Sequence, residues 1–235
     1  MASKFLRPLV FRRASSAIMD LLENMGKKEN WDRFYEKRRD SEQLKHFEWF
    51  FGFDAVHNLI LSCLRSQSPP ESLRLVLDLG CGTSALGPSI YQHSPWPVQV
   101  TCVDISPVAV RLMQEHWKSS RVQGKHPSSS LCFLEMDGAE LHNLFGLRSL
   151  DMIVDKGTMD SLLRSREGPA KAEKVFKQCL RALCPSGSLL QFSDEDPDVR
   201  LLWLEQHSRG LKTGVQVQEV GVIGGVCYYC YLISP

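Results

Sequence analysis

Long apolar runs are absent from this 235-residue sequence, and so is an excess of one charge. No stretch approaches the ~20 consecutive apolar residues that a membrane-spanning helix needs, so we expect no membrane partner. Lys and Arg number 28 and Asp and Glu number 27, which gives a formal net charge of +1. Proteins that bind nucleic acid usually carry a visible basic excess, so we expect no nucleic-acid partner either. The length fits one domain with a short extension.

A regular cysteine spacing is also missing. Eight cysteines are scattered along the chain, and the one close pair, Cys227 and Cys230, lies in a β-rich run where a step of three places the side chains on opposite faces. A zinc or redox site would need a second pair or a strand–helix turn. The seven histidines show no metal-ligand spacing. We therefore expect buried thiols in a reducing compartment and no metal.

The first 19 residues have few acids and many bases. No acidic residue precedes Asp20, Arg12 and Arg13 are followed by serines, and apolar residues recur at helical spacing. This composition is typical of a mitochondrial presequence, which predicts residues 1–19 as a targeting segment and the mitochondrial matrix as the location. A disordered basic tail is the alternative.

Upstream of residue 73 the pattern is helical and rich in aromatic residues. The segment WDRFYEKR (31–38) places three aromatic side chains on one helical face, and FEWFFGFDAV (47–56) follows it. We expect helix over residues 20–65, then a loop over the proline- and serine-rich residues 66–72. Residues 20–72 are thus predicted to form a helical segment that covers a cofactor site.

From residue 73 to 235 short apolar runs alternate with helical patterns. Helices are expected over 106–120 and 172–187, and a polar loop over 193–200. Strands are expected over 73–80, 97–106, 130–137, 150–157, 188–193, 215–223 and 226–234, the last two joined by a glycine pair typical of a hairpin. Alternating strands and helices imply parallel pairing with right-handed crossovers. The sequence therefore predicts an α/β, Rossmann-like, seven-stranded mixed sheet with an N-terminal helical extension.

The sharpest motif is LDLGCGTSALG (77–87), between an expected strand and the next helix. Gly80 and Gly82 allow a tight turn and a close approach to a ligand. The helix that follows would present backbone N–H groups to an anion. A glycine pair alone is weak support, but here it has the required strand–turn–helix context.

Two acidic residues follow expected strands. Asp104 is placed to accept hydrogen bonds from two ribose hydroxyls; the alternative is a helix cap formed with Ser106. Asp137, followed by Gly138, fits an acceptor at the edge of an adenine, and a turn aspartate is its alternative.

Together these pieces resemble the class I S-adenosylmethionine-dependent methyltransferases over about residues 70–235. The resemblance implies S-adenosylmethionine as the cofactor. Gly80 and Gly82 would line its methionine end, Asp104 and Ile105 would lie at the ribose, and Asp137 and Gly138 at the adenine. A dinucleotide-binding turn would have a third glycine, where this sequence reads G-C-G-T-S-A.

Narrower motifs resemble the lysine methyltransferases that modify elongation factor 1A and their relatives. These motifs are WDRFY (31–35), FEWFF (47–51) and VDKGTMD (154–160). The resemblance implies that Trp31, Tyr35 and Lys156 contact the cofactor. A packed helix face is the alternative for the two aromatic residues, and a surface charge for Lys156.

The stretch FSDEDPDVRL (192–201), with the basic N-terminus, resembles the mitochondrial citrate synthase lysine methyltransferases. This implies a protein-lysine methyltransferase with citrate synthase as its substrate protein. The alternatives are a small-molecule methyltransferase and a catalytically silent cofactor-binding scaffold.

Carboxylates near the expected carboxyl ends of strands are the candidates for the reaction itself. Asp155 ends the fourth strand beside the expected methyl group, and Asp194 follows the fifth; both are predicted catalytic residues. Glu195 and Asp196 are predicted to attract and orient the substrate lysine. A solvated acidic loop is the alternative for the residues after the fifth strand.

Overall fold

The computed structural model describes residues 24–38, 47–66, 71–120, 122–210 and 213–235. Seven strands form one sheet in the order β3-β2-β1-β4-β5-β7-β6. They are β1 (Arg74–Leu79), β2 (Val98–Asp104), β3 (Ser130–Glu135), β4 (Leu150–Lys156), β5 (Leu183–Ser193), β6 (Gly214–Ile223) and β7 (Val226–Ser234). The first five pair in parallel, while β7 runs antiparallel to both β5 and β6. The predicted mixed sheet and its terminal hairpin are confirmed.

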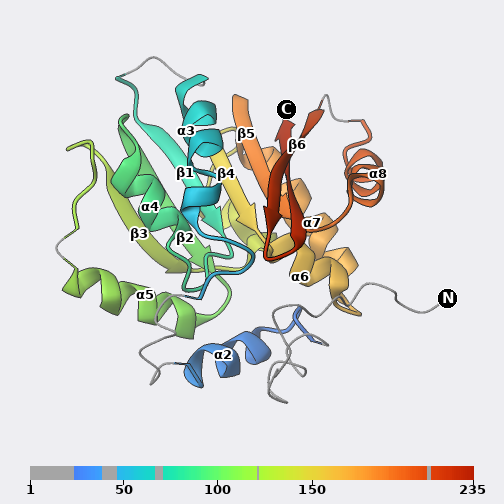
Figure 1. Cartoon of the computed structure of the whole chain (residues 1–235), viewed down its shortest axis with the longest axis horizontal. Helices are drawn as coiled ribbons and strands as arrows, with labels where there is room; N and C mark the ends of the chain where they lie inside the picture. Colours follow the sequence, from blue (N-terminus) through green and yellow to red (C-terminus); the bar gives the residue numbers. More distant parts are fainter. Residues whose placement is uncertain (1–23, 39–46, 67–70, 121, 211–212) are drawn as a thin grey trace.

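Helices cover both faces of the sheet (Figure 1). One face carries α3 (His57–Ser66), α4 (Leu86–His93) and α5 (Pro107–Ser119), and the other carries the 3-10 helix η3 (Gly138–Asn143), α6 (Thr158–Arg164), α7 (Gly168–Ala182) and α8 (Pro197–His207). Successive strand residues serve opposite faces, as strand geometry requires. Val76 belongs to the first core cluster and Leu77 to the second. The central strands are therefore buried on both sides.

Two boundaries differ from the sequence-based expectation. Helix α7 ends at Ala182, not at residue 187, and β5 begins at once with Leu183. Pro185 explains the early end, because a proline disfavours helical geometry in the residue before it. The expected loop over 193–200 is also shorter, since α8 begins at Pro197. The Asp196 side chain caps this helix and Pro197 takes its first position, a common start signal.

The upstream segment is only partly helical. Helix α2 (Lys28–Glu36) and the 3-10 helix η2 (Phe53–Ala55) form, but residues 47–52 between them are irregular, which corrects the prediction of continuous helix. Phe50 has a φ of 72°, in the left-handed region that breaks a helix. Helix α3 packs on the sheet through Ile60 and Leu64 and so belongs to the core. The predicted presequence, residues 1–19, lies outside the described residues.

Two further expectations, one about the cysteines and one about membrane-spanning helices, can be compared with the structure. None of the eight cysteines, all of them within the described residues, forms a disulfide; four are buried, but Cys132 is exposed, so the expectation of buried thiols holds only in part. In the described part of the chain, no helix is both long and apolar enough to cross a membrane.

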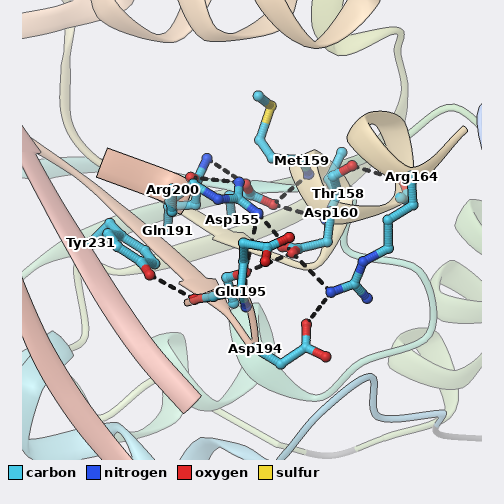
Figure 2. Close-up of polar contacts among 12 residues, drawn as sticks. Asp155, Thr158, Met159, Asp160, Arg164, Gln191, Asp194, Glu195, Arg200 and Tyr231 are labelled. Atoms are coloured by element: carbon cyan, nitrogen blue, oxygen red, sulfur yellow. Dashed lines mark hydrogen bonds and ion pairs between the residues drawn. The ribbon is translucent and has the colours of Figure 1, made fainter. Parts of the chain in front are cut away.

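A buried polar network ties the carboxyl ends of β4 and β5 to α6 and α8 (Figure 2). The Arg200 guanidinium on α8 donates to Asp160 Oδ1 at 2.8 Å, to Gln191 Oε1 at 3.1 Å and to Ser193 Oγ at 3.1 Å. Gln191 Nε2 in turn donates to Asp155 Oδ2 at 3.1 Å. The Arg200 and Asp160 side chains are 2% and 1% exposed, so this is a fully buried ion pair. It fixes the edge of the sheet on which the site is built.

We predict that Arg200→Met destabilises the fold strongly. The substitution keeps an unbranched side chain but leaves the Asp160 carboxylate buried without its closest cation. We therefore expect the free energy of unfolding to fall by about 3–5 kcal/mol, measured by urea unfolding. Arg181→Met on the exposed side of α7 is the control, with an expected change below about 0.5 kcal/mol. Equal effects of the two substitutions would contradict a stabilising role for the network.

Candidate active site

A cavity lies at the carboxyl ends of β1, β2 and β4. It holds about 920 Å³ including its opening to solvent, within the usual size range of small-molecule sites. All nine residues predicted to contact the cofactor line it: Trp31, Tyr35, Gly80, Gly82, Asp104, Ile105, Asp137, Gly138 and Lys156. The structure thus brings together residues that span the sequence from α2 to β4. The four predicted catalytic and substrate-binding carboxylates do not line this cavity.

The glycine loop depends on glycine for two reasons. Gly80 and Gly82 have φ values of 66° and 51°, which residues that carry a side chain rarely adopt. A Cβ on Gly80 would lie 1.8 Å from Thr158 Oγ1, and one on Gly82 would lie 2.3 Å from Tyr35 Oη. The loop is therefore held tightly between α6 and α2. A substitution at either position would push one of these elements away.

The sequence predicts that the backbone N–H groups at the start of α4 face an anionic ligand, but in the structure they donate to side chains of the protein. The N–H of Ala85 donates to Glu48 Oε1 at 2.7 Å and that of Gly87 to Asp78 Oδ2 at 3.0 Å. The N–H of Leu86 donates to the hydroxyl of Ser84 at 3.1 Å. Side chains of the protein already satisfy the start of α4, so this helix end is not a free anion site.

The Asp104 carboxylate is buried and points back to the glycine loop. Its Oδ2 accepts from the N–H of Gly82 and its Oδ1 from the N–H of Ser106, both at 2.8 Å. Ser106, and not Asp104, caps α5 by accepting from the N–H of Ala109. Burial raises the pKa of Asp104 to about 6, although the two backbone hydrogen bonds oppose the shift. Each oxygen retains a lone pair that a ribose hydroxyl can use.

Asp137 lines the cavity and also serves as the turn aspartate considered as its alternative role. Its Oδ1 accepts from the N–H of Ala139 at 2.9 Å and so caps η3, as a turn aspartate would. Its Oδ2 forms an ion pair with Lys171 Nζ at 2.6 Å. Lys171 lies on α7 and also lines the cavity, a contact that the sequence did not reveal.

The aromatic residues of α2 form one wall of the cavity. Trp31 and Tyr35 are stacked, with 6.0 Å between their ring centroids, and Trp31 Nε1 donates to the carbonyl of Met25 at 2.6 Å. Asp32, between them in sequence, accepts from the hydroxyl of Ser106 at 2.5 Å. The packed helix face and the cavity wall are therefore the same surface.

Lys156 is buried and is not a surface charge. Its side chain is 4% exposed, and its Nζ donates to Glu48 Oε2 and to the carbonyl of Trp49, both at 2.7 Å. Glu48 also accepts from the hydroxyl of Ser84 at 2.8 Å. Sequence reasoning missed Glu48, although it lies inside the FEWFF motif. The Glu48–Lys156 pair attaches the upstream segment to the glycine loop and to β4.

Asp78, on β1, is a second cavity residue that sequence reasoning missed, even though it belongs to the glycine motif. It is 2% exposed, and burial raises its pKa to about 7. In the described ranges, no three His, Cys, Asp or Glu side chains converge as a metal site.

Asp155 occupies a structural position. It is fully buried; its Oδ1 accepts from the N–H groups of Thr158 and Met159, and its Oδ2 accepts from Gln191. Burial and the nearby charge of Asp160 raise its pKa to about 7. These contacts favour a role in holding the turn between β4 and α6 over direct contact with substrate.

The acidic residues after β5 have separate surroundings (Figure 2). Asp194 is paired with Arg164 of α6. Asp196 caps α8, and the Glu195 main chain bonds to Ser193 and Tyr231. Catalysis by Asp194 and substrate binding by Glu195 and Asp196 stay predictions.

Because the pKa of Asp104 is raised, we predict that cofactor binding depends on pH. Protonation below its pKa of about 6 removes charge from the predicted acceptor of the ribose hydroxyls. Affinity for S-adenosylmethionine should therefore fall as the pH is lowered from about 7.5 to about 5.5, measured by calorimetric titration. Asp104→Ala should bind at least about tenfold more weakly at the higher pH and depend less on pH.

Asp78 still titrates in this variant, so the comparison with the unmodified protein isolates Asp104. The melting temperature of Asp104→Ala reports any structural loss from the freed N–H groups of Gly82 and Ser106. An equally steep pH dependence in both proteins would assign it to another group.

Known proteins share both the sequence and the fold. A family model described as a methyltransferase domain matches residues 76–187. The citrate synthase-lysine N-methyltransferase of Danio rerio, named as mitochondrial, is 55% identical over 224 residues, which are 94% of this chain and 88% of the relative. EEF1A lysine methyltransferase 4 of Mus musculus is 32% identical over 179 residues, 73% of this chain and 62% of the relative.

A solved structure of low sequence identity agrees in fold. The magnesium protoporphyrin IX methyltransferase of Synechocystis PCC 6803, crystallised with bound S-adenosylmethionine, matches with a TM-score of 0.58 at 14% identity, covering 94% of this chain and 96% of that one. The cofactor of this fold and domain is S-adenosylmethionine. By sequence identity and fold, this chain belongs to the S-adenosylmethionine-dependent protein-lysine methyltransferases, in the family of the citrate synthase-lysine N-methyltransferases.

Proposed function

We propose that this chain transfers a methyl group to a lysine side chain of citrate synthase in the mitochondrial matrix. The observation that carries this proposal is the 55% identity to the Danio rerio relative across 94% of the chain. That span takes in more than the cofactor-binding core, because the methyltransferase-domain match ends at residue 187. The relative's name includes its mitochondrial location, and the basic residues 1–19 agree with it.

The cavity fits S-adenosylmethionine by the chemistry of its walls. The Asp104 carboxylate offers free lone pairs for two ribose hydroxyls, and Asp137 with the N–H of Gly138 offers an acceptor and a donor for the adenine edge. The glycine loop leaves room for the methionine part. Trp31 and Tyr35 supply apolar cover from α2. These assignments are the residue-level part of the proposal.

When bound, the cofactor would supply a methyl group on a positively charged sulfur. A neutral amine would attack the methyl carbon in line with the C–S bond, which breaks as the sulfur leaves as a neutral thioether. The protein therefore has to hold donor and amine in one geometry, which is a proximity task. It also has to favour the neutral form of a side chain whose ordinary pKa is ~10.4. Phe47 and Trp49 in the cavity wall exclude water, and desolvation lowers the pKa of an entering ammonium.

The positive charge of the buried Lys156 also favours the neutral form of the entering lysine. It lies in the cavity wall, so it disfavours a second cation beside it, although its pairing with Glu48 weakens the effect. The carboxylates after β5 lie outside the cavity and favour the ammonium form, which suits them for docking more than for the transfer step.

The test uses the full chain, tritiated S-adenosylmethionine and purified citrate synthase. We expect label on citrate synthase, recovered as methyl-lysine after hydrolysis, and loss of nearly all label with Asp104→Ala. A mitochondrial extract assayed in parallel shows whether other proteins are labelled.

Label on other proteins alone would refute citrate synthase as the substrate and keep the enzyme class. Label on small molecules alone would favour the small-molecule alternative. Binding of cofactor without any transfer would favour a silent scaffold.

A further inference from the structure

Aromatic side chains continue outward from the cavity wall. Trp49 lines the cavity and lies against Gly157, where a Cβ would be 2.7 Å from Trp49 Cδ1. The next residue, Phe50, has a left-handed backbone with φ of 72°. Its ring centroid lies 6.3 Å from that of Trp49 and 5.1 Å from that of Tyr228. Trp49, Phe50 and Tyr228 therefore form a continuous wall, here called the aromatic wall, from the cavity to β7.

Tyr228 joins this wall to a pair of opposite charges. It lies near the start of β7, beside the carboxyl end of β5, because Ser193 pairs with Tyr229. Burial raises the pKa of the Tyr228 hydroxyl, the charge of Asp194 raises it further, and that of Arg164 lowers it. Asp194 directly follows Ser193, so this carboxylate and its partner Arg164 lie beside the start of β7.

The Arg164–Asp194 pair lies beside the cavity, because Arg164 shares one face of α6 with the cavity residue Ser161. Arg164 follows Ser161 by three residues on α6, and Ser161 lines the cavity. The guanidinium is bound to Asp194 and lies 3.6 Å from Asp160 Oδ1 (Figure 2). The two side chains are 37% and 27% exposed, so both are accessible to a partner. In the free protein, the cationic side chain of Arg164 therefore occupies the position beside the Asp194 carboxylate.

We propose that the aromatic wall and Asp194 form the entrance for the acceptor lysine, and that Arg164 holds the place of a substrate cation in the free protein. This inference rests on the proposed function. When the substrate protein docks, the Asp194 carboxylate releases Arg164 and pairs instead with a basic side chain of the substrate. This electrostatic contact fixes the orientation of the substrate protein. The aliphatic stem of the lysine lies along Phe50 and Trp49, whose faces also attract its ammonium. Both residues then direct the amine into the cavity.

The proposal predicts that substitutions of the two members of the ion pair differ in their effect on the KM for citrate synthase. Asp194→Asn should raise the KM for citrate synthase about tenfold, because the docking carboxylate is lost. Arg164→Gln should lower that KM or leave it unchanged, because a competitor is removed. Neither substitution should change the cofactor dissociation constant by more than about twofold. A purely structural ion pair would give the same direction of change in both variants.

Two further variants test the wall and control for charge and folding. Phe50→Ala should raise the KM for citrate synthase with little change in cofactor affinity, whereas Tyr229→Phe, on the opposite face of β7, should change neither. Asp198→Asn removes an exposed charge from the same acidic stretch and should also leave the KM unchanged. Melting temperatures identify any variant that is not folded.

The outcomes separate this entrance from the proposed function. Unmodified protein that labels citrate synthase, with KM values that change alike in Asp194→Asn and Arg164→Gln or in neither, would overturn the entrance alone. Failure of the unmodified protein to label citrate synthase would overturn the proposed function and the entrance with it. Higher KM only in Asp194→Asn and Phe50→Ala would support both.

Discussion

The Glu48 carboxylate joins the segment before the sheet to two parts of the cofactor cavity. It accepts from Ser84 and Ala85 at the start of α4 and from the buried ammonium of Lys156 at the end of β4. Without Glu48 that ammonium would stay buried after losing its ion-pair partner, although it would keep the carbonyl of Trp49, and such a loss is costly. This attachment helps to position the aromatic wall beside the cavity, while the hydroxyl of Ser106 donates to Asp32 on the α2 side.

This arrangement explains why the site extends beyond the matched methyltransferase domain, which begins at residue 76. The domain supplies the glycine loop and the strand-end acids, which are the predicted contacts of the nucleoside part of the cofactor. The upstream segment adds the rings that exclude water and that lead outward to Tyr228 and Asp194. The proposed cofactor contacts of the upstream segment and the proposed acceptor entrance thus belong to the same short part of the chain.

The sequence predicts the sheet, and the residues that line the cavity, well because both follow local rules. Glycines after a strand and acids at strand ends meet at one edge of a parallel sheet, which located Gly80, Asp104 and Asp137. The same rule does not show that the Asp155 carboxylate accepts from the N–H groups of the next turn and lies outside the cavity lining; its catalytic role stays a prediction. The Glu48–Lys156 pair spans 108 residues and follows an irregular loop, so no local pattern could show it.

The most direct test of the account is a double-mutant cycle on the cofactor dissociation constant. Calorimetric titration of S-adenosylmethionine compares the unmodified protein with Glu48→Gln, Lys156→Met and the combined variant. If the pair holds the upstream segment over the cavity, each single substitution weakens binding at least about tenfold and the double variant is little worse, a coupling of about 1–3 kcal/mol. Additive effects, or affinities equal to that of the unmodified protein, would contradict the account.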